Sequence, residues 1–192
     1  LAGYFSANAS WELTGTFGLE KISGACYVGG RFGRVDEGIF DTVNLTLSTA
    51  KMPSQVEGET LQGEYVGGII GYIGGDDKKT VEFGSESGMT ISSHLKMKAT
   101  VAAGIIVGAI GQNAQVKLNS CEFSLSVDME SSGDVSAEYF GGFAGMVEGG
   151  AKLGSASDTE KAKVKTKILT YAKRTADGKT EQSKPEIHDS FG

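Results

Sequence analysis

Apolar and polar residues alternate along four segments of the chain, and glycine-rich apolar blocks separate these segments. The alternating segments are Val43–Ser48, Met89–Lys98, Cys121–Met129 and Lys163–Ala172. An apolar residue at every second position is the period of a β-strand that buries one face. Threonine, valine and isoleucine, which strands prefer, are frequent in them. The pattern predicts an all-β protein.

The last alternating segment also fits a helix. Residues 157–160 read as a capping box, and Val164, Ile168 and Tyr171 would share one helical face. Its register with the other three segments favours a strand.

The glycine-rich blocks recur at a nearly constant interval. They begin at Ala25 (ACYVGGRFGRVD), Glu64 (EYVGGIIGYIGG), Thr100 (TVAAGIIVGAIGQ) and Glu138 (EYFGGFAGMVEGG). With Gly30, Gly68, Gly104 and Gly142 taken as equivalent, the spacings are 38, 36 and 38 residues. A fixed period of about 20–50 residues is typical of solenoids, propellers and arrays.

We therefore expect a parallel β-helix, or solenoid, of about four repeats of 36–38 residues. Each repeat would form one long coil or two short ones. The alternative fold is an antiparallel β-sandwich of the fimbrial-subunit type, which also uses many short strands.

Glycines inside apolar runs indicate a positive φ or a close approach of two backbones. Tyr27, Tyr65 and Tyr139 occupy one place in their repeats, which predicts a column of rings that Val101 interrupts. No helical pattern follows the glycines, as a dinucleotide-binding loop would require. No apolar run approaches the ~20 residues of a membrane helix, so no transmembrane segment is expected.

Three of these segments resemble the glycine-rich repeats called GLUG motifs. They are Tyr65–Gly71 (YVGGIIG), Tyr139–Gly145 (YFGGFAG) and Val116–Ser124 (VKLNSCEFS), and the resemblance covers about residues 24–172. Two places depart from the motif: Gly29–Gly33 (GGRFG) has an arginine in the apolar slot, and Ala103–Gly108 (AGIIVG) holds an extra residue. The family occurs in bacterial surface proteins and haemagglutinin-like adhesins and is similar to parallel β-helices. The resemblance implies an extracellular protein that acts by adhesion.

The two ends of the chain differ from the repeats. Residues 1–23 are expected to form an N-terminal cap or an entering strand, and residues 24–172 the repeat domain. Residues 173–192 are polar and are expected to be a C-terminal tail or the continuation into a longer protein. Both ends of a stack of strands need a cap or a neighbour.

Composition and charge narrow the possible partners. The 192 residues include 29 glycines and 2 prolines without a collagen period, and 39% are hydrophobic, which is not a disordered composition. The net charge is −6, so no nucleic-acid partner is expected. Residues 150–192 carry 9 basic and 6 acidic side chains and are therefore basic, whereas the remainder is acidic.

Acidic side chains follow the glycine blocks and would form a column in a stack of repeats. The candidates are Asp36, Asp76, Asp77 and Glu148. Such a column could ligate calcium or work on a glycosidic bond as an acid/base pair. Alternatively, these side chains are solvated turn residues. No cofactor other than calcium at this column is expected.

Four lysines alternate with smaller residues near the C-terminus. On a strand, Lys161, Lys163, Lys165 and Lys167 would share one face. They predict a cationic stripe for an anionic glycan or an acidic partner, including another copy of this acidic chain. Alternatively, they protect an edge strand from unwanted pairing.

The remaining reactive side chains suggest no catalytic site. Cys26 and Cys121 lack metal-site spacing and are expected to be buried thiols. His94 and His188 lack a carboxylate at a recognisable spacing. The sequence thus favours a non-enzymatic surface or appendage protein outside the cell that acts by adhesion or self-assembly. Its partners would be copies of itself, the rest of a larger chain or surface glycans. The alternative is a carbohydrate-binding or carbohydrate-cleaving β-helix that uses the turn carboxylates.

Overall fold

The computed structural model describes most of the chain. The described residues are 2–18, 22–48, 61–75, 78–84, 89–94, 97–119, 122–128, 135–155, 163–170, 172–174 and 180–182. All regular structure in them is β-strand, as the alternating pattern predicted. The prediction that residues near the C-terminus form a strand is confirmed by β17 (Lys163–Thr170).

Among the described residues, the largest sheet contains eleven strands, and all of its pairings are parallel. Its members are β1 (Ala2–Gly18), β4 (Phe32–Ser48), β6 (Ile70–Ile73), β7 (Thr80–Phe83), β8 (Met89–His94), β10 (Val107–Ile110), β11 (Gln115–Leu118), β12 (Glu122–Asp128), β15 (Ala144–Val147), β16 (Lys152–Ser155) and β17. We call it the main sheet.

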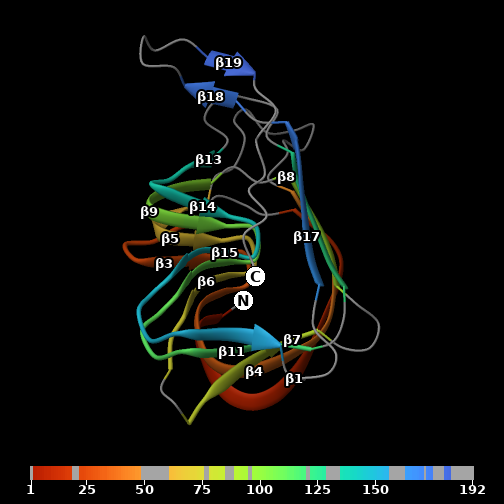
Figure 1. The fold of residues 1–192 in the computed structure, drawn as a ribbon, viewed down its shortest axis with the longest axis vertical. Coiled ribbons are helices and arrows are strands. Elements are labelled where there is room, and N and C mark those ends of the chain that lie inside the picture. The colour runs from red at the N-terminus through yellow and green to blue at the C-terminus, as the bar shows by residue number, and fades with distance from the viewer. Residues whose placement is uncertain are drawn as a thin grey trace.

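The main sheet is curled because β1 and β4 are long, curved strands (Figure 1). Successive parts of β4 pair with β6, then β7, then β8. The strands of the next repeats, β10 to β12 and β15 to β17, continue these three pairings in the same order. Strands one repeat apart in sequence are therefore neighbours in space.

A second, smaller sheet lies beside the main sheet (Figure 1). It contains β2 (Ile22–Ser23), β3 (Tyr27–Gly29), β5 (Leu61–Gly67), β9 (Met97–Gly104), β13 (Val135–Ser136) and β14 (Tyr139–Gly141), all in parallel pairs. The last two strands, β18 (Ala172–Arg174) and β19 (Thr180–Gln182), form a separate antiparallel pair.

The prediction of a parallel β-helix is wrong. The described strands form a curled main sheet and a separate smaller sheet, and they do not define four closed coils. The physical reason is that a repeat period fixes which strands become neighbours, whereas closure depends on the connections between strands. The antiparallel sandwich is also wrong, because every pairing in the two larger sheets is parallel.

The apolar residues that alternate along the strands point inward and form the core. In β7, Val81 and Phe83 are buried while the residues between and before them are partly exposed, and β11 repeats this pattern. Aromatic rings contact one another within the core. Phe40 stacks on Phe83 with a centroid distance of 5.1 Å, and Phe83 meets Phe143 edge-on at 5.3 Å.

The first and last described strands of the chain belong to three different sheets. Within residues 1–23, β1 pairs with β4 along its length, and β2 pairs with β5. Within residues 173–192, the described residues belong to the antiparallel β18–β19 pair.

Candidate functional site

Each repeat reverses direction tightly between the smaller sheet and the main sheet. Only two residues join β5 to β6, and the same holds for β3–β4, β9–β10 and β14–β15. A Cβ added at Gly67 would lie 1.8 Å from the carbonyl oxygen of Ile70, and one added at Gly71 would lie 2.4 Å from the backbone nitrogen of Val28. Backbone segments are in direct contact at this reversal and leave no room for a side chain. Close approach therefore explains why glycine occupies these positions.

The glycines form ladders, but their register differs by one residue from the expected equivalence at Gly104. The structure pairs Gly29 with Gly67, and it pairs both Gly67 and Gly141 with Gly104. Gly30, Gly68 and Gly142 each follow a ladder glycine, and the residue in their place in the third repeat is Ile105. In this register Ala103–Gly108 contains no extra residue.

Three tyrosines form a cluster beside this reversal. Tyr27 of β3 pairs in register with Tyr65 of β5, and their ring centroids are 5.8 Å apart. Tyr72 of β6 stacks on Tyr27 at 4.4 Å with an interplanar angle of 24° and lies 5.6 Å from Tyr65. All three side chains are half-buried. We call them the tyrosine cluster.

The expected aromatic column is only partly formed. We call residues that pair across successive strands a row. In this row Tyr27 and Tyr65 are direct neighbours, the next residue is Ala102, and Tyr139 follows it. Ala102, and not Val101, therefore separates Tyr139 from the cluster.

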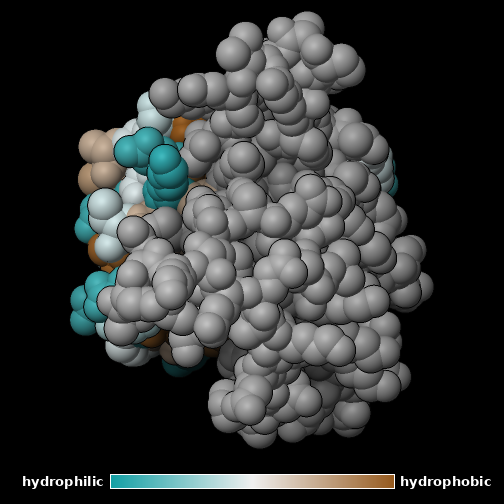
Figure 2. Space-filling model, turned by 90° about the horizontal axis from the view of Figure 1, so that it is seen from above, coloured by the Kyte–Doolittle hydropathy of each residue, from teal (hydrophilic) through white to brown (hydrophobic). Residues whose placement is uncertain are grey.

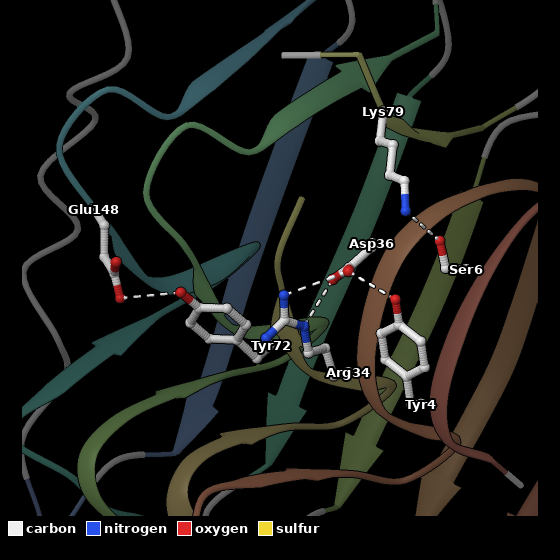
Figure 3. A network of polar contacts seen from close by, with 7 residues as sticks. All are labelled: Tyr4, Ser6, Arg34, Asp36, Tyr72, Lys79 and Glu148. Atoms are coloured by element: carbon white, nitrogen blue, oxygen red, sulfur yellow. Dashed lines mark hydrogen bonds and ion pairs between the residues drawn. The ribbon is translucent and has the colours of Figure 1, made fainter. Parts of the chain in front are cut away.

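Arg34 and Asp36 extend the cluster along β4 (Figure 3). Arg34 donates hydrogen bonds to Asp36 from Nε at 2.7 Å and from Nη2 at 3.4 Å, and Tyr4 donates its hydroxyl to Asp36 at 2.9 Å. The guanidinium carbon lies 5.7 Å from the ring centroid of Tyr72 and 6.0 Å from that of Tyr4. The hydrogen bond to Asp36 raises the pKa of Arg34, although burial opposes it.

The two charges of this ion pair differ in their access to water. Asp36 is 8% exposed, while the side chain of Arg34 is 38% exposed. The buried carboxylate of Asp36 thus fixes the position of the Arg34 guanidinium at the surface. Near Tyr4 and also on β1, the hydroxyl of Ser6 accepts a hydrogen bond from Lys79 at 3.0 Å (Figure 3).

Tyr72 links the cluster to a second carboxylate. Its hydroxyl lies 3.5 Å from Oε1 of Glu148, and the backbone nitrogen of Gln112 donates to Oε2 of Glu148 at 3.0 Å. Burial, followed by the charge of Glu148, raises the pKa of Tyr72 to about 12. A Cβ at Gly111 would lie 1.9 Å from the Tyr72 hydroxyl, so the absent side chain makes room for the phenol.

The carboxylate column expected from the sequence is incomplete in the described residues. Asp36 and Glu148 occupy the same row of the repeats, and Gly74 and Gly111 fill the places between them, as successive backbone hydrogen bonds show. Asp76 and Asp77 lie outside the described residues. Among the residues that the structure describes, no group of three or more potential ligands is placed to hold a metal ion.

The lysine stripe is described only in its backbone. Lys163, Lys165 and Lys167 lie in β17, opposite Glu122, Ser124 and Ser126 of β12. Lys161 lies outside the described residues. The structure does not bring these lysine positions next to the tyrosine cluster, because they belong to a different part of the main sheet (Figure 1).

The expectation for Cys26 is corrected. Its thiol is free and exposed, because it precedes the first tight reversal instead of facing the core. Cys121 and His188 lie outside the described residues, and His94 ends β8.

Sequence reasoning missed Tyr4, Arg34 and Tyr72. Arg34 and Tyr72 occupy equivalent positions in consecutive repeats, since they pair in register. Aligning the first two glycine blocks residue by residue would have shown a cation and a phenol in the same row. Tyr4 carried no such signal, because β1 lies outside the repeats.

Searches of protein-family models, curated proteins and solved structures found no match to this chain. The resemblance to GLUG motifs therefore remains a prediction from the quoted residues. Within the described residues, no helix has the length and apolar character needed to cross a membrane.

Proposed function

We propose that this chain is a non-enzymatic surface protein outside the cell that adheres to carbohydrate through the tyrosine cluster, Tyr4 and Arg34. The observation that carries the proposal is the convergence of four tyrosines and an arginine from β1, β3, β4, β5 and β6. Solvent reaches this place, since Tyr4 is 58% exposed and the three cluster tyrosines are half-buried.

The chemistry of these side chains suits a sugar. Ligand sites combine aromatic surface with a few polar groups that fix orientation. Tyrosine rings offer flat, rigid apolar faces to the C–H groups of a pyranose, and their hydroxyls remain available to water and ligand. Glu148 and Arg34 supply acceptors and donors for ring hydroxyls, and Asp36 holds the Arg34 guanidinium in place. Figure 2 shows that hydrophilic and hydrophobic residues lie side by side on the described margin of the molecule seen from above.

The spacing of the carboxylates favours binding over cleavage. Asp36 and Glu148 stand three strand positions apart in one row, which is roughly 14 Å of backbone separation at about 4.8 Å per strand. Glycosidases place their two carboxyl groups about 5–9.5 Å apart. Each carboxylate also already accepts hydrogen bonds from the protein. Both observations support a non-enzymatic role.

A glycan array probed with the fluorescently labelled chain tests this function. We expect retention on specific neutral glycans, and we expect Tyr65→Ala to abolish it while Tyr65→Phe keeps most of it. Tyr139→Ala is the matched control, because Tyr139 lies in the same row but beyond Ala102. Thermal unfolding of each variant checks that the fold is intact.

Two results would overturn the proposal. One is that the wild-type chain binds no glycan on the array. The other is that folded Tyr65→Ala and Tyr139→Ala retain glycan equally well.

A further inference from the structure

The large hydrophobic side chains that are exposed among the described residues all lie on strands at the ends of the sheets. They are Tyr4 on β1, Val147 on β15 and Tyr139 on β14. In the described part of the chain, β1 pairs only with β4, β15 only with β10 and β14 only with β9. These strands therefore present one edge without a described neighbour.

One row of the main sheet shows how a strand without a described neighbour leaves an apolar side chain exposed. Its members in order of stacking are Phe5, Val35, Ile73, Ile110 and Val147. The three inner members are fully buried, whereas Val147 is 46% exposed. The residue type is apolar throughout, so the exposure of Val147 reflects the absence of a described strand beyond β15.

The two edges of the main sheet have matching directions and rows. Every pairing in this sheet is parallel, and β1 and β15 lie at opposite ends of the same rows. A second copy displaced along the stacking direction would present its β1 to β15 in the parallel sense. In that register Ala2 lies opposite Ala144, Tyr4 opposite Met146 and Phe5 opposite Val147.

Charge favours the same contact. The C-terminal residues 150–192, which include β16 and β17, are basic, with 9 basic and 6 acidic side chains, in a chain whose net charge is −6. The strand β1 contains one acid, Glu12, and no lysine, arginine or proline. Natural edge strands that resist pairing carry such guarding residues. The edge of β1 lacks them, and a basic end approaching an acidic body is attracted.

The middle of β1 is irregular, which limits the pairing to its two regular parts. Register shifts fall between Phe5 and Ser6, between Ser6 and Ser10, and between Trp11 and Glu12. Residues 2–5 and 12–18 pair regularly with β4. Bulges twist a strand edge locally, so we assign the contact first to residues 2–5.

We propose that the open edge of β15 in one copy pairs in parallel with β1 of a second copy, so that copies add head to tail and extend the main sheet. This contact joins two different surfaces, so it does not close on itself in a dimer. It would bury Val147 of one copy against Phe5 of the next, just as Ile110 is buried one strand inward in the same row. The contact includes Tyr4, which also belongs to the proposed carbohydrate site, but the backbone pairing requires no bound glycan.

Engineered cysteines test both the contact and its register. The variant carries Ala2→Cys and Ala144→Cys, with Cys26→Ser and Cys121→Ser to remove the native thiols. Paired positions on neighbouring strands lie about 5 Å apart, within the range of about 4.4–6.8 Å that a disulfide bridges. We expect mild oxidation to give a ladder of trimers and larger species on a non-reducing gel, because each copy offers two different cysteines.

The matched control shifts one cysteine by two residues along β15. In Ala2→Cys with Met146→Cys, the two positions are about 8 Å apart between neighbouring copies, given about 3.3 Å per residue along a strand. We expect little cross-linking there. Equal ladders from both variants would overturn the proposed register.

Native mass by light scattering provides the second measurement. We expect the wild-type mass to rise with protein concentration. Val147→Lys should lower the mass, because it places a charge opposite Phe5 while the side chain remains tolerated at an exposed position. Tyr139→Lys, at the end of the smaller sheet, should leave the mass unchanged. A wild-type chain that stays monomeric at all concentrations and yields no cross-linked ladder would overturn the proposal.

Discussion

Replacing Gly67 by alanine tests whether the two larger sheets depend on direct contact between backbones. The φ of Gly67 lies outside the left-handed region, so alanine is opposed there by contact alone. The added Cβ would lie 1.8 Å from the carbonyl oxygen of Ile70, and ordinary contact begins at 3.4 Å. Because protein interiors have little spare volume, β5 and β6 would have to separate by about 1.5 Å.

The energetic cost follows from what that separation breaks. Gly68 donates a hydrogen bond to the carbonyl of Gly104 at 3.2 Å, and Ile69 donates one to Ile106 at 3.1 Å. Losing both costs about 2 kcal/mol, and overpacking a well-packed site costs about 1–3 kcal/mol. We expect Gly67→Ala to lower the free energy of unfolding by about 3–5 kcal/mol, which lowers Tm by roughly 6–20 °C in a chain of this length.

Urea unfolding followed by circular dichroism measures this effect. Gly154→Ala in β16 is the matched control, because nothing lies within 4 Å of its added Cβ. Its free energy of unfolding should change by less than about 0.5 kcal/mol. If the two variants unfold within about 1 kcal/mol of each other, the close backbone contact does not hold the sheets together, and the reasoning is refuted.

Three further substitutions probe the cluster and the core. Tyr72 should ionise near pH 12, and because the fold favours its protonated form, stability should decline as pH rises from about 10 to 12; an absorbance titration identical to that of Tyr72→Phe would contradict this. Gly111→Ala should destabilise the fold by about 1–3 kcal/mol through its clash with the Tyr72 hydroxyl, and a double-mutant cycle with Tyr72→Ala should recover most of that loss. Phe40→Ala should lower the free energy of unfolding by about 3–5 kcal/mol, since Phe40 is fully buried and stacked on Phe83. A loss below about 1 kcal/mol in urea unfolding would show that the stacked Phe40–Phe83 pair is not a main source of stability.

The strand content and the neighbours of each strand were predictable because they depend on local pattern. Alternation marks strands, and a constant period places equivalent strands side by side. The pairing of Tyr27 with Tyr65 follows directly from that period. The path between strands was not predictable, because a curled sheet and a closed coil can share the same period and the same alternation.

The one-residue shift at Gly104 shows a second limit. Glycine pairs anchored the alignment of three repeats, but the third repeat has isoleucine after its ladder glycine. Only the backbone pairing reveals which glycine of a pair touches the opposite sheet. The shift also moves the gap in the aromatic column from Val101 to Ala102.

The candidate site was the least predictable part. Asp36 was identified as a possible ligand in a turn, yet it lies in a long strand and is buried beside Arg34. Tyr4, which donates a hydrogen bond to Asp36, lies 32 residues before it and outside the repeats. Tyr72, which lies against Arg34, belongs to the next repeat. Alignment of the repeats could have placed Arg34 beside Tyr72, but the contact of Tyr4 with Asp36 becomes visible only when the strand pairing is known.

The glycine ladders make the repeats interchangeable at their tightest contacts. Gly67 meets Gly104 through backbone atoms alone, and Gly104 meets Gly141 in the same way. Because these contacts involve no side chains, they do not distinguish one repeat from another. The order of the repeats is instead specified by unlike neighbours such as Arg34 and Tyr72. A chain that lost residues 67–103 would join Val66 to Gly104 and keep an intact reversal. Whole repeats can therefore be gained or lost without any change to the residues that form the close backbone contact.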